Sequence, residues 1–249
     1  EGNITAWIES RANDYLRQAL AGVQKLAYAE ALASGYVNAI DLITPYVADL
    51  ENVIDMQAIA NATKATKAQV WVMAPMITLP GEAAAFVSMA REYGLTQAGV
   101  MIEVPAAIFH ADEITKVCDF VSIGTNDLGQ YLHAADRESA PLAGFNDPWQ
   151  PALLRAVHQV AQAGVKNNTP VGVCGEAASD AALASVLIGL GVSSLSCSVA
   201  TLTDVAQAIT AHSVQQLVLA GNTAIAANTA LDAKNSARSQ LVELAQLGL

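Results

Sequence analysis

The sequence predicts an α/β fold, in which a parallel sheet is covered by helices. From residue 69 onward, short apolar runs alternate with longer amphipathic stretches, which is the pattern of repeated βαβ units. The chain of 249 residues is also 53% hydrophobic, enough to bury the core of one barrel-sized domain, with or without a helical appendage. An open five-stranded sheet and part of an eight-stranded barrel both agree with this pattern.

Residues 1–66 differ from the rest because they are rich in alanine and mostly helical in pattern. Apolar residues at helical spacing predict one helix that runs from near the amino terminus to Val23, and a second helix that begins near Pro45. Residues 36–43 have the composition of a weak strand. We identify no catalytic constellation in this part of the chain.

Five apolar runs predict the strands of the sheet, and each is followed by a turn signal and a helical pattern. We expect these strands at residues 69–74, 98–104, 120–123, 170–175 and 194–198. Short continuous apolar runs are typical of parallel strands that are buried on both faces, joined by right-handed crossovers. At the end of the chain, residues 224–247 are expected to form one long helix.

Charge and cysteine content narrow the functional classes. The net charge is −11, and the twelve basic residues are scattered, which argues against nucleic acid as a partner. The three cysteines, Cys118, Cys174 and Cys197, are an odd number in apolar surroundings and indicate reduced thiols of a cytoplasmic protein. The sequence shows no secretory signal pattern and no apolar run long enough to cross a membrane.

Polar residues follow the predicted strands where the carboxyl ends of parallel strands meet and ligands bind. Glu103, Asp127 and Cys174 come at or just after the ends of three strands, and Gly124 lets the backbone turn before Asp127. Two carboxylates from neighbouring strands can hold Mg²⁺ together with waters and substrate oxygens. Helix capping explains Asp127 equally well, and an apolar cysteine is most often a small core residue.

The histidines and the known catalytic motifs give weaker indications of a functional site. His133 lies in the helical stretch after the central turn, whereas His110, His158 and His212 are expected on helix surfaces. We find no Ser–His–Asp order, zinc-ligand spacing or glycine-rich phosphate loop in the sequence. An acidic protein that binds an anion must therefore build its positive site locally, from arginines, backbone amides or a divalent metal.

Four ordered stretches resemble one known family. They are GVMIEVPAA (99–107), DFVSIGTNDLGQYLHAADR (119–137), PVGVCGEAASD (170–180) and LGVSSLSCS (190–198). They are similar to the phosphoenolpyruvate (PEP)-binding domain of Enzyme I, the PEP–protein phosphotransferase of the bacterial sugar phosphotransferase system. Pyruvate phosphate dikinase and PEP synthase share this domain, but the segments DLGQY and AADR favour Enzyme I.

This resemblance implies both a fold and an activity. The fold would be a TIM-type (β/α)₈ barrel in which strands four to eight are recognisable, with residues 67–249 as the barrel portion and residues 1–66 as an atypical helical part. The activity would be Mg²⁺-dependent transfer of the phosphoryl group from PEP to a histidine of a phosphohistidine domain, with release of pyruvate. That domain would in turn phosphorylate the HPr carrier, and the protein would be a homodimer.

The resemblance also assigns roles to individual residues. Glu103 and Asp127 would bind the metal, while Gly124, Asn126 and Arg137 would contact the substrate. Cys174 would be the acid that protonates the methylene carbon of the enolate. These roles agree with general chemistry, because a metal can neutralise phosphate and enolate charge and a thiol beside a cationic site can donate a proton.

The first third of the chain departs from the family. Residues 1–66 lack the arginine-rich motifs of the family's first three strands, and Arg11 and Arg17 do not lie in a matching context. Two alternatives therefore stay open. One is a non-catalytic domain that binds PEP or pyruvate, or that dimerises. The other is a metal-dependent aldolase or lyase acting on pyruvate enolates, which would not need Cys174.

Overall fold

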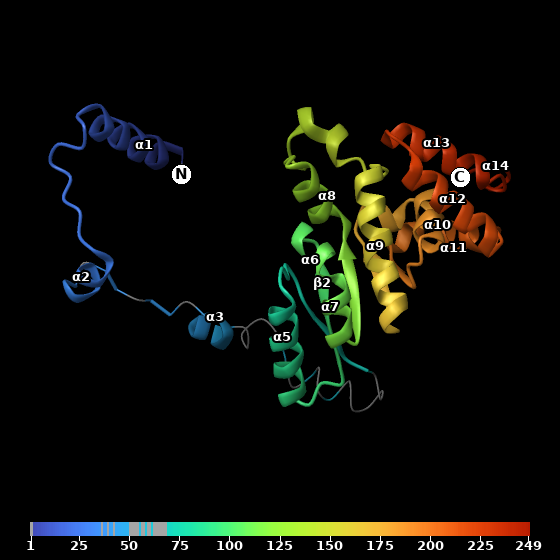
Figure 1. Ribbon diagram of the computed structural model, residues 1–249, viewed down its shortest axis with the longest axis horizontal. Coiled ribbons are helices and arrows are strands. Elements are labelled where there is room, and N and C mark those ends of the chain that lie inside the picture. The colour runs from blue at the N-terminus through green and yellow to red at the C-terminus, as the bar shows by residue number, and fades with distance from the viewer. Residues whose placement is uncertain are drawn as a thin grey trace. The chain divides into compact units, whose positions relative to one another are not determined.

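The computed structural model describes residues 2–35, 37–38, 40–41, 43–49, 55, 58, 61 and 69–249 (Figure 1). The chain divides into two compact units, Glu1–Lys64 and Ala65–Leu249. The helices described in the first unit are α1 (Gly2–Arg17), α2 (Tyr28–Ala33) and α3 (Ile43–Asp49). Helix α3 is the helix expected near Pro45, and most of its predicted continuation lies outside the described residues.

Two predictions for the first unit are corrected. Helix α1 ends at Arg17 rather than Val23, because the chain turns through Leu20, whose φ of 63° does not continue a helix. The weak strand predicted at residues 36–43 is absent from those of its residues that are described. The predicted boundary after residue 66 lies outside the described residues.

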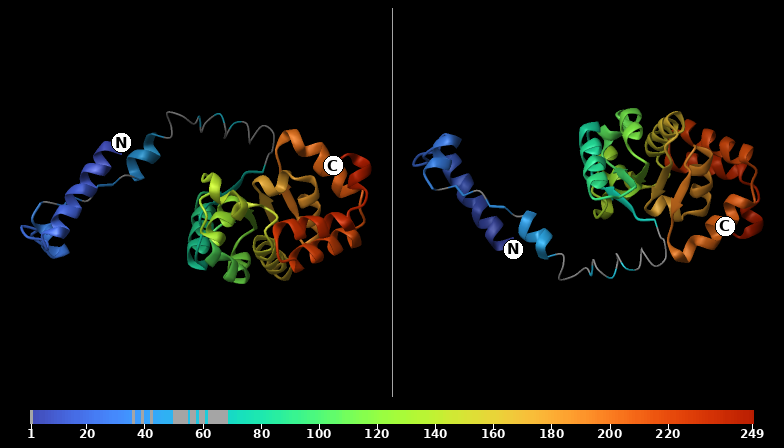
Figure 2. Two further views of the ribbon diagram at one scale, coloured as in Figure 1. Left: turned by 90° about the horizontal axis from the view of Figure 1, so that it is seen from above. Right: turned by 90° about the horizontal axis from the view of Figure 1, so that it is seen from below.

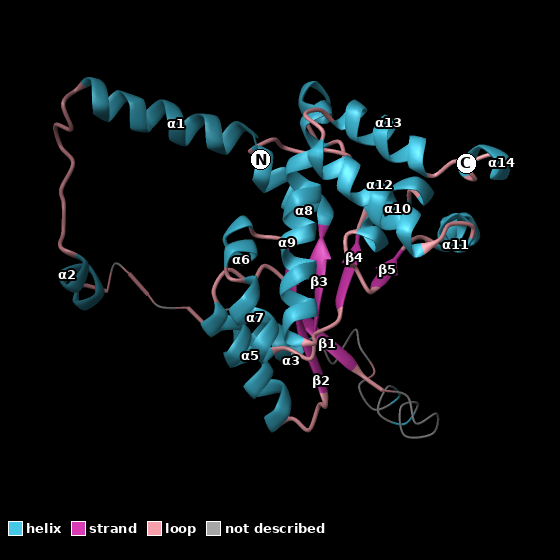
Figure 3. Cartoon of the chain, turned by 45° about the vertical axis from the view of Figure 1, so that its right-hand side comes forward, coloured by secondary structure: helices cyan, strands magenta, loops and turns pink. Residues whose placement is uncertain are grey.

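The second unit is built on a five-stranded parallel sheet (Figure 3). Its strands are β1 (Trp71–Ala74), β2 (Gln97–Ile102), β3 (Phe120–Gly124), β4 (Val171–Cys174) and β5 (Ser194–Ser196), and they lie in the order β1-β2-β3-β4-β5. Because neighbours in the sheet are also neighbours in the chain, right-handed crossovers place the connecting helices on the same face. The predicted α/β class and the parallel sheet are confirmed.

The helices of this unit are connected by short loops and by three 3₁₀ turns, η2 (Ala140–Asn146), η3 (Glu176–Ser179) and η4 (Val199–Thr201). They are α5 (Pro80–Glu92), α6 (Pro105–Phe109), α7 (Ala111–Val117), α8 (Thr125–His133), α9 (Pro151–Asn167), α10 (Ala181–Gly189), α11 (Leu202–Thr210), α12 (Val214–Ala226), α13 (Ala230–Gln240) and α14 (Leu244–Leu247). Figure 2 shows the orange and red carboxyl-terminal helices packed together beside the yellow helix α9. None of the described helices is both long and apolar enough to cross a membrane.

The single terminal helix predicted at residues 224–247 is wrong. The chain leaves helical geometry at Ala227, whose φ and ψ are −67° and 163°. Thr229 then begins a new helix, because its side chain accepts a hydrogen bond from the Asp232 N–H. A polar residue that satisfies an early helical N–H is a strong start signal, so α12 and α13 form as separate helices.

The two faces of the sheet differ in what they carry. The face toward the helices holds the buried aliphatic residues of the core: Val100, Ile102, Val121, Ile123, Val171 and Val173. The opposite face surrounds a hollow of about 440 Å³ whose lining includes small or exposed residues such as Ser122, Gly172, Ser194 and Ser196. Burial on both faces was predicted for all five strands. This prediction holds for β3. It is wrong for β1, where Trp71 is 52% exposed, and for β5, where Ser194 and Ser196 are exposed.

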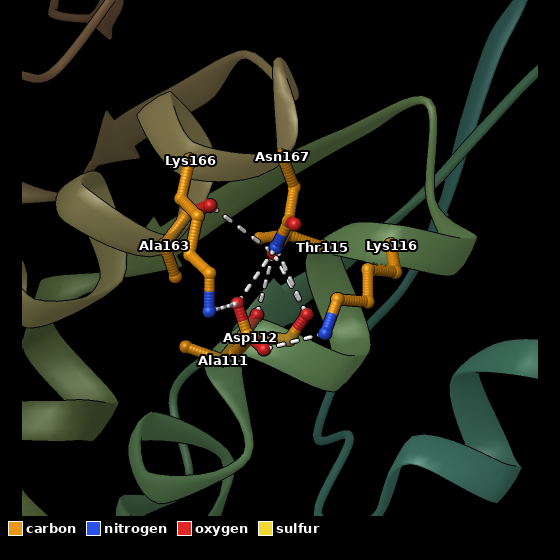
Figure 4. A network of polar contacts seen from close by, with 7 residues as sticks. All are labelled: Ala111, Asp112, Thr115, Lys116, Ala163, Lys166 and Asn167. Atoms are coloured by element: carbon orange, nitrogen blue, oxygen red, sulfur yellow. Dashed lines mark hydrogen bonds and ion pairs between the residues drawn. The ribbon is translucent and has the colours of Figure 1, made fainter.

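A polar network joins α7 to α9 (Figure 4). The Asp112 carboxylate pairs with Lys116 of its own helix and with Lys166 of α9, and it accepts a hydrogen bond from Asn167 Nδ2. Asn167 Nδ2 also donates to Thr115 Oγ1. These contacts, above all the one with Lys116, hold the pKa of Asp112 well below its usual value, so the network is charged at neutral pH.

Candidate functional site at the carboxyl ends of the strands

The carboxyl ends of β2, β3 and β4 bring three predicted positions into one row. In the parallel ladder Ile102 pairs with Ile123, and Gly124 pairs with Cys174. Glu103, one residue further on, therefore lies beside Gly124. The spacing is close, since a Cβ atom on Gly124 would lie 2.5 Å from Glu103 Oε2. Laterally paired residues of neighbouring strands point to the same face, so Glu103 and Cys174 share the face opposite the helices.

Glu103 is buried, with 4% of its surface exposed. Its Oε1 accepts a hydrogen bond of 2.8 Å from the Met76 N–H, in the turn after β1. Among the residues that the structure describes, no Lys, Arg or His side chain forms an ion pair with it. Burying a carboxylate without a positive partner is unfavourable, so this position suits a bound cation.

Asp127 lies in the first turn of α8 and is half-buried. The structure does not show it as a helix cap, because Gly124 occupies the N-cap position and no side chain caps the helix. Its Oδ1 instead lies 3.3 Å from Arg137 Nη1. Arg137 itself is exposed, and its backbone N–H donates to Gln130 Oε1. The structure thus brings a predicted metal ligand and a predicted substrate ligand together.

The first residues of α8 tie the end of β3 to the loop after β4. Thr125 Oγ1 donates to the Cys174 carbonyl at 2.7 Å, and Asn126 Oδ1 accepts from the Glu176 N–H at 3.1 Å. Gly175 lies between them with a φ of 92°, and a Cβ atom there would come within 2.6 Å of Thr125 Oγ1 and 2.7 Å of Asn126 Oδ1. Because Asn126 Oδ1 already accepts this hydrogen bond, Asn126 Nδ2 is the atom that can donate a hydrogen bond to a ligand.

The cysteines differ in environment. Cys174 is half-buried at the end of β4, and its Sγ lies 3.5 Å from the Ile123 carbonyl oxygen. Cys118 is buried, and this burial, with a smaller effect of Asp119, raises its pKa to about 11. A thiol with such a pKa stays protonated and unreactive at neutral pH. Of these two thiols, the one at the strand ends is placed for chemistry.

The predicted metal ligands, Glu103 and Asp127, are carboxylates, the kind of donor that Mg²⁺ accepts. Within the described part of the chain, no group of three or more His, Cys, Asp or Glu side chains is arranged to hold a metal. Glu103 and Asp127 would therefore supply two carboxylates. Mg²⁺ is usually bound in this way, with waters and substrate phosphate oxygens completing its coordination.

A pocket of about 240 Å³ lies beside these residues and is lined by Asn126, Arg137, Ala143, Asn146 and Glu176. Asn126 and Arg137 were predicted as ligands, whereas Asn146 and Glu176 were not. Glu176 follows Cys174 by two residues, so the strand-end rule could have identified it. Asn146 comes from η2, and no local sequence signal points to it.

Two of the histidines contact backbone carbonyl oxygens of the helical turn before them. His133 Nδ1 lies 2.9 Å from the Gly129 carbonyl oxygen within α8. His212 was expected on the surface but is buried, with Nδ1 2.6 Å from the Ala208 carbonyl oxygen and Nε2 3.0 Å from Glu243 Oε2. His212 therefore connects the end of α11 to the start of α14.

The family model and the most similar curated sequences agree with each other. The family model described as PEP-utilising enzyme, PEP-binding domain, matches residues 46–214. The phosphoenolpyruvate-protein phosphotransferase of Streptomyces coelicolor is 41% identical over 187 residues, which are 75% of this chain and 34% of that protein. Its namesake from Chlamydia pneumoniae is 49% identical over 98 residues, which are 39% of this chain and 17% of that protein.

The chain spans about a third, or less, of the length of these curated relatives. A phosphoenolpyruvate-protein phosphotransferase from Haloferax volcanii is 38% identical over 159 residues, covering 59% of this chain and 28% of that protein. A solved citrate lyase from Burkholderia xenovorans covers 72% of this chain and 64% of its own, with 15% identity and a TM-score of 0.44. That structural similarity is too low to support a conclusion.

Proposed function

Because the chain belongs to the family of PEP-utilising enzymes and matches its PEP-binding domain, we propose that it binds PEP for phosphoryl transfer, as in Enzyme I of the bacterial sugar phosphotransferase system. One observation carries this proposal. Glu103, Gly124 and Cys174 lie in one row at the strand ends, and Asp127 and Arg137 face each other beside it. This arrangement supports a site in which two metal-binding carboxylates, a cationic substrate ligand and a thiol acid would act together.

PEP is a small anion with a phosphate and a carboxylate, so its binding requires donors and positive charge. Arg137 supplies a guanidinium, which can hold either group with two parallel hydrogen bonds. Asn126 Nδ2 supplies a neutral donor, because its Oδ1 already accepts from the Glu176 N–H. Mg²⁺ held by Glu103 and Asp127 would neutralise charge on the phosphate and on the enolate.

Phosphoryl transfer requires little covalent chemistry from the side chains of the protein. The bond between phosphorus and the enolate oxygen breaks as the acceptor bonds to phosphorus, so that catalysis depends on positioning and charge stabilisation. The enolate then takes a proton at its methylene carbon and becomes pyruvate. Cys174 is the proposed donor of this proton, since its half-buried thiol lies at the end of β4 beside Gly124.

We extend the proposal to the architecture and the partners. The sequential parallel strands and the hollow at the sheet face opposite the helices support a sheet that forms part of a (β/α)₈ barrel, with residues 67–249 as the barrel portion and residues 1–66 as an atypical helical part. The acceptor would be a histidine of a phosphohistidine domain that passes the group to the HPr carrier in the cytoplasm. The barrel part would also form the homodimer.

Calorimetric titration of the whole chain with PEP tests the proposal. We expect binding in the presence of Mg²⁺ and none in the presence of a chelator. Asp127→Asn should abolish the Mg²⁺-dependent binding, while Asp204→Asn, on exposed α11, should leave it unchanged. If the chain does not bind PEP with Mg²⁺, the proposed function is wrong.

A further inference from the structure

The pocket beside the strand ends is enclosed by three segments of the chain. Asn126 comes from helix α8, and Arg137 follows the end of that helix. Ala143 and Asn146 belong to η2, and Glu176 is the first residue of η3. Because the walls belong to different segments, the shape of the pocket depends on the contacts that hold the three segments to one another.

Two of these contacts are made by residues that line the pocket. Helix α8 is joined to η3, because Asn126 Oδ1 accepts a hydrogen bond of 3.1 Å from the Glu176 N–H. The chain just after α8 is joined to η2, because Asn146 Nδ2 donates to the Ala135 carbonyl at 3.0 Å. These two bonds attach η2 and η3 to the region of α8, but neither of them connects η2 with η3.

Trp149 supplies a connection between η2 and η3. Its indole Nε1 donates a hydrogen bond of 3.2 Å to Oδ2 of Asp180, the residue directly after η3. The other oxygen of that carboxylate, Oδ1, accepts from the Leu183 N–H and caps helix α10. Both carboxylate oxygens are therefore engaged, so Asp180 is held by the helix through one oxygen and by the indole through the other.

The indole is itself fixed close to η2. Trp149 is 2% exposed, and its backbone N–H donates to Oδ1 of Asp147, the residue directly after η2. The next residue, Gln150, donates from Nε2 to the Gly144 carbonyl within η2 at 2.9 Å. An indole nitrogen can only donate, and a buried donor that loses its acceptor is unfavourable. The contact with Asp180 is therefore specific to the indole N–H.

We propose that Trp149 and Asp180 are positioning residues whose hydrogen bond closes a ring of contacts through α8, η2 and η3. The ring holds Asn126 and Arg137 in the geometry that an anionic substrate requires. Neither positioning residue lines the pocket, so both act through the residues that do. This inference rests on the proposed function and adds the contacts that preorganise its substrate donors. Without the indole bond, the contact between Glu176 and Asn126 opens more often.

Amide hydrogen exchange in the ¹⁵N-labelled chain tests this role without any ligand. The readout is the exchange rate of the Glu176 N–H divided by that of Val173 in the buried strand β4, because a general loss of stability would speed both. Trp149→Phe should raise this ratio at least about fivefold, since η3 loses a hydrogen bond to a carboxylate. Trp71→Phe is the matched control and should leave the ratio within about twofold, because the Trp71 indole donates to Gln69 beside β1.

A second variant and a double variant test the hydrogen bond itself. In Asp180→Asn the amide oxygen can still cap α10, whereas the amide nitrogen cannot accept from the indole. This variant should raise the exchange ratio as Trp149→Phe does. Because both changes remove the same contact, the double variant should exceed the stronger single variant by no more than about twofold. An unchanged ratio in either single variant, or effects that multiply in the double variant, overturns the proposal.

Calorimetric titration with PEP and Mg²⁺ on the same samples separates this inference from the proposed function. Trp149→Phe should weaken PEP binding at least about fivefold, and Trp71→Phe should leave it within about twofold of the unmodified chain. If PEP binds the unmodified chain and Trp149→Phe equally well, the positioning role is wrong and the PEP site stands. If PEP does not bind the unmodified chain, the proposed function fails, and the exchange ratios alone uphold or overturn the contact between η2 and η3.

Discussion

Replacing Gly175 with alanine should damage the site through two independent effects. The first is conformational, because Gly175 has a φ of 92° and a ψ of −170°, a region that is almost restricted to glycine. The second is steric, because the new Cβ atom would lie 2.6 Å from Thr125 Oγ1 and 2.7 Å from Asn126 Oδ1. Neither neighbour can move freely, since each is anchored by a hydrogen bond to the loop after β4.

The size of the effect can be worked out from these contacts. Forcing alanine into this backbone region costs about 1–3 kcal/mol. Displacing the two side chains loses two hydrogen bonds, each worth about 0.5–1.5 kcal/mol. Gly175→Ala should therefore lower the free energy of unfolding by about 2–6 kcal/mol, and PEP binding should weaken as well because Asn126 is displaced.

Urea unfolding followed by near-ultraviolet circular dichroism measures the stability change, and calorimetry measures PEP binding. Gly144→Ala is the matched control, because Gly144 lies in η2 near the same site and a Cβ atom there would meet nothing within 4 Å. The control should change the free energy of unfolding by less than about 0.5 kcal/mol. If Gly175→Ala unfolds at the same urea concentration as Gly144→Ala, the loop is not held as described.

Three further predictions concern the reactivity of the cysteines, the loss of stability at low pH and the role of Arg137 in substrate binding. In the folded protein at neutral pH, iodoacetamide should label Cys174 before Cys118, whose pKa is raised to about 11 by burial; equal labelling, read by mass spectrometry, would contradict this. Asp112→Asn should destabilise the protein at neutral pH. Because neighbouring lysines lower the pKa of Asp112, its contribution is present above the unfolded pKa and disappears in acid; a pH-independent difference in urea unfolding would refute this. Arg137→Ala should weaken calorimetric PEP binding by about 10- to 150-fold, the effect of one charged hydrogen-bond donor, whereas an unchanged affinity would remove Arg137 from the site.

The strands of the sheet could be predicted because each one is encoded by a short continuous stretch of sequence. Each strand is a short apolar run closed by a glycine, proline or polar residue, and parallel strands place the residues after them at one edge. From sequence alone, that rule places Glu103, Asp127 and Cys174 at this edge. The structure adds that Gly124 has an ordinary φ of −84° and is small because the Glu103 carboxylate lies against it.

Features that depend on packing were not predictable in this way. Asn146 lines the pocket because η2 packs against α8, and residues nearby in sequence do not indicate that packing. His212 is buried because α11 and α14 meet around it, although its sequence context is typical of a surface helix. Exposure of β1 and β5 depends on what covers the face opposite the helices, which strand composition does not encode.

From the charges at the strand ends we expect that the proposed substrate binds only together with a cation. Glu103, Asp127 and Glu176 contribute three negative charges around the site, and Arg137 contributes one positive charge that already pairs with Asp127. PEP adds further negative charge, and like charges a few ångströms apart repel strongly when they are partly buried. A divalent ion held by Glu103 and Asp127 would neutralise this excess negative charge and would leave the Arg137 guanidinium available to the substrate. PEP and Mg²⁺ should therefore bind cooperatively, each raising the affinity for the other by the same factor, and independent binding in calorimetry would contradict this charge argument.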